Sequence, residues 1–446
     1  MPRTVLPAGL TPVDAAERFL DLPGVALLES PPGFPRLGQR SYLSADPVAG
    51  RGRTTLGRPP AGHIRLGYLA YEYGRQLERI PAAAYDDLEL PDLLWPTYDW
   101  WIEWDHSDHT ATLHAATDER LRWAAERLAA PRPKLRWLRP HEVRPTARAE
   151  RFPAPDLGPG IHSTFPAAGY REAVRRVVEY IKAGDIFQAN LSQRFSTTFE
   201  AHPWALYRAL RAGSPAPFSA YLQHDDHAVV SHSPERFLRL DPRGWVETRP
   251  IKGTRPRGAT PAEDRALVQE LLASAKDRAE HVMIVDLLRN DLSRVCSPGT
   301  IRCDELMALE SYPSVHHLVS TVSGHLAPGQ GAAELIRATF PGGSITGAPK
   351  LRAMEIIAEL EPTARGVYCG AIGIWRADDA LDLSIAIRTA VVRNEQVSWS
   401  AGGGIVVDSD PDAEYRETLD KARAIARAVA GAQGRDGETA RRRGGE

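Results

Sequence analysis

Residues 401–422, AGGGIVVDSDPDAEYRETLDKA, join a glycine-rich strand to the start of a long helix. Glycine inside a strand weakens it, and usually marks a β-bulge or a place where a ligand or another backbone comes close. The helix begins at Ser409-Asp410-Pro411, because a capping side chain followed by proline is a start signal. Its first turns place Glu414, Glu417 and Lys421 on one face. A solvated pair of Glu417 with Lys421 explains this spacing as readily as a functional site does.

The composition is that of a folded protein with little net charge. The chain has 446 residues and a mass of 49.0 kDa, enough for two or three ordinary domains or one large one. With 55 Lys and Arg against 57 Asp and Glu, the net charge is −2 and the pI is about 6.7. No global positive field attracts phosphates, so we expect no nucleic-acid partner.

The cysteines and the N-terminus predict a cytoplasmic protein. Cys296, Cys303 and Cys369 have no C-x-x-C spacing, which predicts neither a disulfide framework nor a zinc site, and a reducing compartment fits best. Prolines and charged residues interrupt every apolar run of residues 1–30, so we expect no signal peptide. No segment reaches the ~20 apolar residues that cross a bilayer, and we expect no membrane partner.

Prolines divide the chain into two parts. Residues 1–130 are typical of short strands and turns. Eight prolines between residues 131 and 166 break helices and weaken sheets, which predicts a linker or an extended crossing segment. Residues 167–430 hold most candidates for chemistry. Residues 431–446 contain almost no apolar side chain, so we expect a disordered tail.

Apolar spacing predicts the helices of the second part. Apolar residues recur at helical spacing from Tyr170 to Ile181, and Gly184 is a natural C-cap. A second helical region covers residues 261–290 in two pieces, and residues 185–195 between these regions alternate like a strand.

Several charged residues stand in apolar surroundings and therefore need a partner. Glu280 precedes the apolar run 282–285, so its carboxylate requires a cation or a proton. Paired with Glu417 it could hold Mg²⁺, which prefers hard oxygen ligands. Arg388 lies in an apolar strand pattern, where a bidentate carboxylate is its simplest partner. That carboxylate could belong to the protein or to a ligand.

Two further segments carry residues suited to binding or catalysis. FPGGSITGAPK (340–350) opens a helix whose amides could receive an anion, although its lysine is not at the Walker position. RPIKGTRPRG (249–258) carries Lys252. A lone lysine in a strand and turn usually faces solvent, but near other cations its pKa falls from ~10.4 towards neutrality, and the free amine is a nucleophile.

Eight segments, in this order, resemble the chorismate-utilising enzymes. They cover residues 165–430 densely and reach weakly into residues 26–30 and 41–47. The resemblance implies an α+β fold of two packed antiparallel β-sheets flanked by helices, with the active site between them. The segments are GDIFQANLSQRF (184–195), SPERF (233–237), RPIKGTRPRG (249–258), AKDRAEHVMIVDLLRND (275–291), VHHLVS (315–320), FPGGSITGAPK (340–350), AIRTA (386–390) and AGGGIVVDSDPDAEYRETLDKA (401–422).

The resemblance implies a metal and two catalytic residues. Glu280 and Glu417 would hold Mg²⁺, with Glu414 close by or acting through water. Lys252 would attack C2 of chorismate while Glu235 protonates the departing C4 hydroxyl. Other matching residues would bind the substrate: the pyruvyl carboxylate by Arg388, Tyr368 and the backbone of Gly402, Gly403 and Gly404, and the ring by His317, Ser344 and Lys421.

Three places separate the branches of this family. Isochorismate and salicylate synthases carry a lysine that activates water where this sequence has Gln188, and an amide cannot act as that base. Anthranilate synthases carry alanine in place of Lys252 and a Met-Phe-Phe pattern near residues 217–221. At Lys252 and at residues 217–221, this sequence resembles the aminodeoxychorismate branch.

That branch converts chorismate and ammonia to 4-amino-4-deoxychorismate, for p-aminobenzoate and folate synthesis or for a specialised metabolite. No residue set resembles a glutamine amidotransferase, so ammonia would come from solution or from an amidotransferase partner subunit. The alternatives are an anthranilate synthase component I and a non-catalytic paralogue that only binds an aromatic acid or a partner. Every position that such a paralogue would lose is filled here.

An N-terminal segment predicts a second ligand. Leu27-Leu28-Glu29-Ser30 resembles the segment that forms the tryptophan pocket of anthranilate synthases. Glu29 would take the ammonium group of tryptophan and Ser30 a neighbouring polar group. A buried strand end with a satisfied carboxylate explains the same residues equally well.

Overall fold

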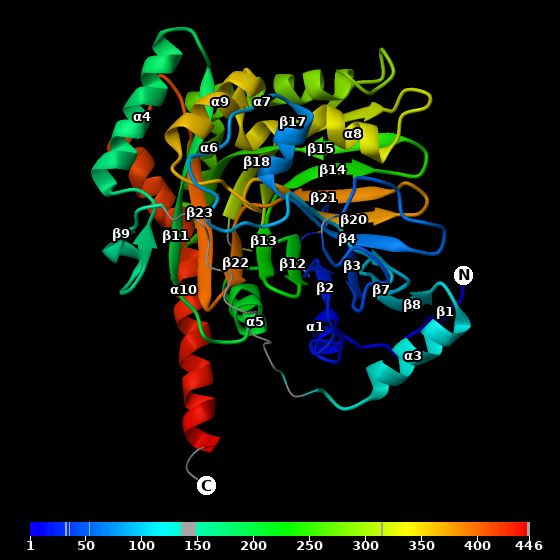
Figure 1. Ribbon diagram of the computed structural model, residues 1–446. Coiled ribbons are helices and arrows are strands. Elements are labelled where there is room, and N and C mark those ends of the chain that lie inside the picture. Colours follow the sequence, from blue (N-terminus) through cyan, green and yellow to red (C-terminus); the bar gives the residue numbers. More distant parts are fainter. Residues whose placement is uncertain are drawn as a thin grey trace.

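The computed structural model describes residues 1–443 except 32, 33, 35, 53, 134, 136–148 and 314, and gives only the backbone of residues 435–443. Two antiparallel sheets pack against each other, with helices on their outer faces (Figure 1). This confirms the predicted α+β class of two packed antiparallel sheets. Within the described residues, no helix is long and apolar enough to cross a membrane.

The larger sheet has 13 strands within the described residues. Its middle is formed by β12, β13, β22 and β23, and all its pairs are antiparallel. In spatial order the strands are β1 (Arg3–Val5), β8 (Thr110–Ala115), β7 (Trp100–Asp105), β3 (Arg40–Ser44), β2 (Ala26–Glu29), β12 (Phe218–Gln223), β13 (Ala228–Ser233), β22 (Thr389–Arg393), β23 (Gln396–Ile405), β11 (Gln188–Thr198), β10 (His162–Ser163) and β9 (Phe152–Pro153), with β19 (Gly347–Ala348) beside β11.

The smaller sheet has 10 strands within the described residues. Its outer end, formed by the neighbouring strands β16 and β18, is one wall of the site considered below. In spatial order the strands are β16 (Ile251–Pro256), β18 (Val315–His325), β15 (Trp245–Arg249), β14 (Arg236–Leu240), β21 (Leu381–Ile385), β20 (Ala371–Arg376), β4 (Ile64–Leu69) and β5 (Leu93–Leu94), with β17 (Arg302–Ser311) beside β18 and β6 (Thr97–Tyr98) beside β4.

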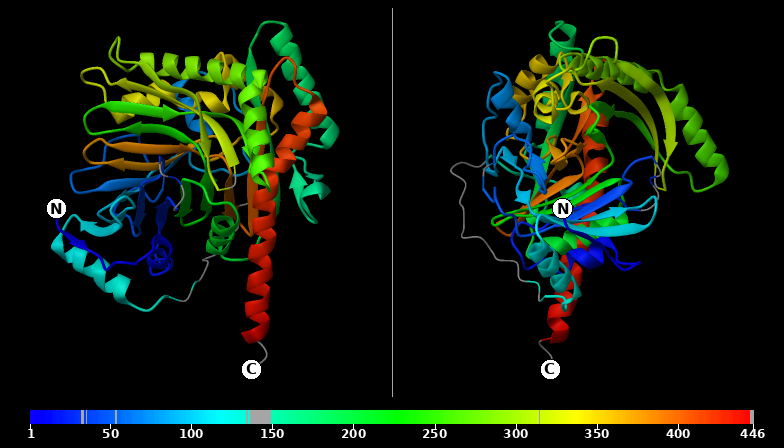
Figure 2. Two further views of the ribbon diagram at one scale, coloured as in Figure 1. Left: turned by 180° about the vertical axis from the view of Figure 1, so that it is seen from behind. Right: turned by 90° about the vertical axis from the view of Figure 1, so that its right-hand side faces the viewer.

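Helices cover the outer faces of both sheets (Figures 1 and 2). The apolar face of α10 packs against α5 and the larger sheet, while α8 packs on α7 above the smaller sheet. The helices are α1 (Pro12–Ala16), α2 (Gly74–Leu77), α3 (Asp118–Ala129), α4 (Ala167–Lys182), α5 (Pro203–Gly213), α6 (Pro261–Ala273), α7 (Ala275–Ser293), α8 (Ala332–Thr339), α9 (Lys350–Leu360) and α10 (Pro411–Arg443), with a short 3₁₀ turn, η3 (Gly343–Ile345).

The proline-rich segment divides the chain but not the fold. Strands from residues 1–130 enter both sheets: β2 pairs with β12 in the larger, and β4 pairs with β20 in the smaller. A buried cluster between the sheets therefore mixes side chains from both sides of the boundary, such as Tyr68 and Val391. Part of the predicted linker, residues 134 and 136–148, lies outside the described residues. Its last part adds β9 and β10 to the edge of the larger sheet.

The expected helices are present, with one difference at the C-terminus. The pieces α6 and α7 match the predicted pair, and Asp410 caps α10 by accepting a hydrogen bond from the amide of Ala413 at 2.8 Å. The disorder expected from residue 431 stays a prediction, and the backbone of α10 continues to Arg443. Ala432 is buried on the apolar face of the helix, which offsets the roughly 1 kcal/mol cost of Gly431. Residues 444–446 lie outside the described residues.

Candidate active site

A cavity of about 580 Å³ opens between the outer end of the smaller sheet, the strand β23, and the first turns of α7 and α10. Gly403 and Glu414 lie behind its lining, and Glu414 is only 4% exposed. All the other residues predicted for the chorismate site line it: Glu235, Lys252, Glu280, His317, Ser344, Tyr368, Arg388, Gly402, Gly404, Glu417 and Lys421.

The three glycines lie where β23 is crowded on both sides. Gly402, Gly403 and Gly404 pair with β11 in unbroken register, so the stretch is not a β-bulge. A Cβ atom at Gly402 would lie 2.5 Å from the carbonyl oxygen of Leu191, and one at Gly404 would lie 2.1 Å from Nε2 of Gln188. Close approach therefore explains the glycines, by the backbone at Gly402 and by a side chain at Gly404, and it is one of the two explanations that the sequence left open.

Arg388 reaches the cavity from the connection between β21 and β22, where its backbone adopts a positive φ of 50°. In the described part of the chain, no carboxylate forms an ion pair with its guanidinium. Burial lowers its pKa, because removal from water disfavours the charged form. The described part of the protein therefore supplies no carboxylate partner for Arg388, and its guanidinium can receive an anionic ligand.

Lys252 and Glu235 provide an amine and a carboxyl group in the same cavity. The Nζ of Lys252, on β16, donates a hydrogen bond to the carbonyl oxygen of Ser344 at 3.2 Å. Burial lowers the pKa of Lys252, although Glu280 and Glu235 oppose this effect. Burial raises the pKa of Glu235 to about 7, against the hydrogen bond from Ser344 and the charge of Lys252. Burial therefore shifts both groups towards their neutral forms, a free amine and a protonated acid.

His317, on β18, is held by a residue that sequence reasoning missed. The hydroxyl of Thr254, its neighbour across the β16–β18 pair, lies 2.8 Å from Nδ1. Burial, followed by repulsion from Arg388, lowers the pKa of His317 to about 3, so the imidazole is neutral. The contact fixes the orientation of the imidazole ring, so that its second nitrogen, Nε2, points away from Thr254. The sequence signal for Thr254 was its position two residues after Lys252 in one strand, because side chains at i and i+2 of a strand point to the same face.

A second missed feature is the buried ion pair between Glu361 and Arg365. Arg365 donates to both oxygens of Glu361, at 2.7 and 2.9 Å, and to the carbonyl oxygen of Ile345 at 3.0 Å. A further bond joins it to the carbonyl oxygen of Asn190 on β11. Its guanidinium lies 6.0 Å from the ring of Tyr368. Arg365 thereby connects three parts of the cavity wall. Its only sequence signal was the spacing of four residues between the opposite charges of Glu361 and Arg365.

Three carboxylates meet at the end of the cavity near α7 and α10. A Cβ atom at Gly403 would lie 3.0 Å from an oxygen of Glu414 and 3.2 Å from an oxygen of Glu417, so both carboxylates lie over this glycine. Glu280 approaches from α7, and Nζ of Lys276 lies within 4.0 Å of an oxygen of both Glu280 and Glu414. Burial raises the pKa of Glu280 and of Glu414.

These carboxylates are held by lysines in the structure. Lys421 forms an ion pair with Glu417 at 2.6 Å, which is the i, i+4 pair expected from the sequence, and both residues line the cavity. Among the described residues, no three metal-ligating side chains form a ready cluster. Three oxygen donors from two helices nevertheless form a donor set that suits a hard divalent cation, so these residues fit Mg²⁺.

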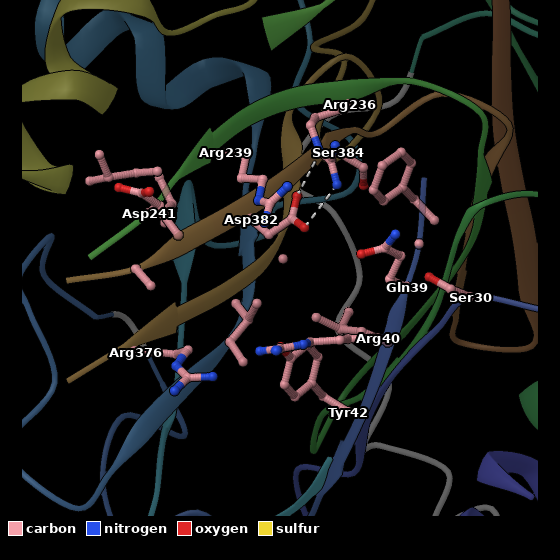
Figure 3. Close-up of a pocket in the computed structure, with 18 of the residues that line it drawn as sticks. Ser30, Gln39, Arg40, Tyr42, Arg236, Arg239, Asp241, Arg376, Asp382 and Ser384 are labelled. Carbon is pink, nitrogen blue, oxygen red and sulfur yellow. Dashed lines mark hydrogen bonds and ion pairs between the residues drawn. The ribbon is translucent and has the colours of Figure 1, made fainter. Parts of the chain in front are cut away.

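A second cavity, of about 720 Å³, lies between the N-terminal strands and the smaller sheet, and Glu29 and Ser30 line it (Figure 3). Arg211 donates to both oxygens of Glu29, each at 2.8 Å, and the hydroxyl of Tyr207 donates to one of them. The hydroxyl of Ser30 donates to the carbonyl oxygen of Pro217 at 2.7 Å. Both residues are thus placed at the predicted pocket, but their polar groups already have partners.

The model of the family described as chorismate binding enzyme matches residues 42–427 of this chain. The chain belongs to the chorismate-binding enzymes. Among its relatives, the aminodeoxychorismate synthase component 1 of Klebsiella aerogenes is 45% identical over 360 residues, which span 81% of this chain and 76% of the relative. The anthranilate synthase component 1 of Thermus thermophilus is 46% identical over 377 residues, 83% of this chain and 78% of that one.

Solved structures of chorismate-binding enzymes share the fold. Anthranilate synthase component I from Streptococcus pneumoniae TIGR4 matches with a TM-score of 0.70 at 28% identity, over 96% of this chain and 92% of that one. The menaquinone-specific isochorismate synthase of Escherichia coli matches with the same TM-score of 0.70 at 17% identity, over 96% and 94%. The protein is therefore a chorismate-utilising synthase, and overall similarity leaves the choice of product to individual residues of the site.

Proposed function

We propose that this protein is an aminodeoxychorismate synthase component I, which converts chorismate and ammonia to 4-amino-4-deoxychorismate. The observation that carries the proposal is the buried amine of Lys252, whose one hydrogen bond among the described residues goes to a carbonyl oxygen. An amine without a carboxylate partner loses its proton readily and becomes a nucleophile. By resemblance, anthranilate synthases have alanine at this position.

The reaction then proceeds by two displacements. The neutral amine of Lys252 forms a bond to C2 of chorismate, the ring double bonds shift, and the C4 hydroxyl leaves with the proton of Glu235 as water. Ammonia next forms a bond to C4, the double bonds shift back, and the amine of Lys252 departs from C2. Two easier steps replace one difficult displacement, and the pyruvyl group stays on the product.

Binding rests on the charges of the cavity. Arg388 pairs with the pyruvyl carboxylate of chorismate, beside Tyr368 and the backbone of Gly402 to Gly404, because no carboxylate among the described residues pairs with its guanidinium. Glu280 and Glu417, with Glu414 close by, would hold Mg²⁺, which supplies charge neutralisation for the ring carboxylate. His317, Ser344 and Lys421 line the ring.

The decisive experiment identifies the product of the purified chain with chorismate, Mg²⁺ and an ammonium salt. We expect a product with the mass of 4-amino-4-deoxychorismate, which releases pyruvate only after a separate lyase is added. Direct formation of anthranilate would assign the protein to the sister activity, and no turnover would favour the non-catalytic paralogue. Full turnover in excess chelator would contradict the metal role.

The source of ammonia is tested in the same assay. The chain offers no nucleophilic cysteine in an amidotransferase context, so glutamine should not replace ammonium unless a glutamine amidotransferase subunit is added. Unprotonated ammonia is the reactive form, so at a given pH turnover should rise with the concentration of NH₃. Glutamine hydrolysis by the single chain would contradict the proposed partner.

The second cavity is the proposed place for tryptophan. It has the size of a small-molecule site, and Glu29 and Ser30 lie on its wall. The ammonium group of tryptophan would share Glu29 with Arg211 and Tyr207, which already bind both of its oxygens. We therefore expect weak binding.

A further inference from the structure

Lys276, in the first turn of α7, lies between carboxylates that belong to two helices. Its Nζ is 3.5 Å from Oε1 of Glu414 on α10 and 4.0 Å from Oε1 of Glu280 on its own helix. Among the described residues, the contact with Glu414 is the only ion pair that joins α7 to α10. Lys276 also lines the cavity.

We propose that Lys276 is a placeholder cation, which holds Glu280 and Glu414 together before Mg²⁺ arrives and competes with the metal for them. The inference rests on the proposed metal role of these carboxylates. Glu414 is 4% exposed and lies beside Glu417. Because little water reaches these carboxylates to screen their charges, they would repel each other strongly without a nearby positive charge.

Three lysines line this cavity, and Lys276 is the one that is able to leave. Lys252 donates to the carbonyl oxygen of Ser344, and Lys421 donates to that of Gly402 at 2.8 Å, so the backbone anchors both. Within the described residues, Lys276 donates to no backbone carbonyl, and its side chain is 52% exposed. It reaches the carboxylates from the solvent side and can swing back there.

The competition has two measurable consequences. A half-exposed ion pair is weak, so removal of Lys276 should tighten metal binding only about 3- to 10-fold. Removal should also loosen the contact between α7 and α10 as long as no metal is bound. The metal should restore that contact, because it attracts the same carboxylates.

The test compares metal binding and helix protection in three variants of the full chain. Mn²⁺ prefers the same oxygen ligands as Mg²⁺, and its free form gives an electron paramagnetic resonance signal, so it is titrated in the absence of chorismate. Lys276→Gln should bind Mn²⁺ about 3- to 10-fold more tightly than the wild type. Lys276→Arg should resemble the wild type, because it keeps the charge. Lys182→Gln, at the exposed end of α4, is the matched control.

Hydrogen exchange over residues 275–285 supplies the second readout. Exchange in Lys276→Gln should be faster than in the wild type without metal and equal to it with Mn²⁺. Unchanged, weaker or undetectable Mn²⁺ binding by Lys276→Gln overturns the proposal. A higher KM for chorismate at unchanged Mn²⁺ affinity would show instead that Lys276 binds the substrate. The metal role itself is tested separately, by the effect of a chelator on wild-type turnover.

Discussion

The two cavities of this protein differ in how far their charges are already paired. In the larger one, of about 720 Å³, Glu29 is held by Arg211, and Arg236 donates to Asp382 at 3.1 Å and to Glu247 at 2.8 Å. In the smaller one, of about 580 Å³, neither Arg388 nor Lys252 forms an ion pair within 4.0 Å among the described residues. Glu29 and Arg236 in the larger cavity are thus paired, whereas Arg388 and Lys252 in the smaller one remain without a carboxylate partner.

The contrast teaches that unpaired buried charge indicates a site better than volume does. A buried cation without a partner costs stability, and a fold keeps it only where a ligand supplies the missing charge. Paired charges in the larger cavity stabilise the connection between the two sheets. Substitutions in the smaller cavity should therefore affect catalysis and binding, and substitutions of the paired residues in the larger one should affect stability.

The largest effect is expected at Lys252. Lys252→Ala removes the nucleophile and should lower kcat by about 10³-fold or more, with little change in chorismate affinity. Lys252→Arg should fail as badly, because the guanidinium stays protonated at any working pH. Product formation at saturating chorismate and ammonium measures both variants. Arg239→Ala, on the wall of the larger cavity, is the matched control and should retain activity. An active Lys252→Arg enzyme would refute the covalent step.

The next effect separates two cavity arginines, Arg388, which is partly buried, and Arg236, which is buried. Arg388→Met should raise the KM for chorismate by about 10²-fold or more, because the substrate carboxylate loses its partner, while Tm stays the same or rises. Arg236→Met should cost about 1–2 kcal/mol of stability, since it leaves the half-exposed carboxylates of Asp382 and Glu247 without their cation. Steady-state kinetics and thermal unfolding of both variants provide the comparison. Equal loss of stability in the two would remove the distinction between the cavities.

A smaller effect concerns pH and Glu235, whose pKa of about 7 lies above its ordinary value. With unprotonated ammonia held constant, kcat should fall about tenfold per pH unit above pH 7, because the leaving hydroxyl needs the proton of Glu235. Burial of the ionised form should also cost on the order of 3 kcal/mol of stability, lost as the pH rises from about 4.5 through 7. Glu235→Gln should have low activity without this pH limb and should gain stability above pH 7. A kcat profile flat to pH 9 would contradict the acid role.

The smallest effect is expected from tryptophan in the larger cavity. Because Arg211 and Tyr207 already donate hydrogen bonds to the carboxylate of Glu29, calorimetry should give a Kd for tryptophan no lower than about 1 mM. Binding in the micromolar range would mean that Arg211 leaves Glu29 when the ligand arrives, and would weaken the contrast between the cavities. Absence of any heat at millimolar tryptophan would remove the tryptophan pocket from the proposal.

Local patterns predicted the main helices and several charged residues of the site, and the resemblance to the chorismate-utilising enzymes supplied the fold class and the other site residues. The motifs around Lys252, Glu280 and Arg388 identified residues that line one cavity, although more than a hundred residues separate the first from the last. The missed residues, Thr254 and Arg365, act through partners distant in the chain, His317 and Asn190. Hydrogen bonds of that kind depend on strand register and loop packing, which no local pattern encodes.

The sequence by itself determined the helices with clear caps, because capping depends on neighbours along the chain. Its eight motifs indicated the α+β class and most of the site residues through their resemblance to the chorismate-utilising enzymes. Only the tertiary structure decided which charges remain unpaired. The sequence left open for both Glu29 and Arg388 whether the partner of the charge is a ligand or the protein. Arg211 comes to Glu29 from a helix 182 residues further along, and no carboxylate among the described residues comes to Arg388. The pairing of a buried charge depends on which side chains the whole fold brings within reach, so it is a property of three-dimensional packing.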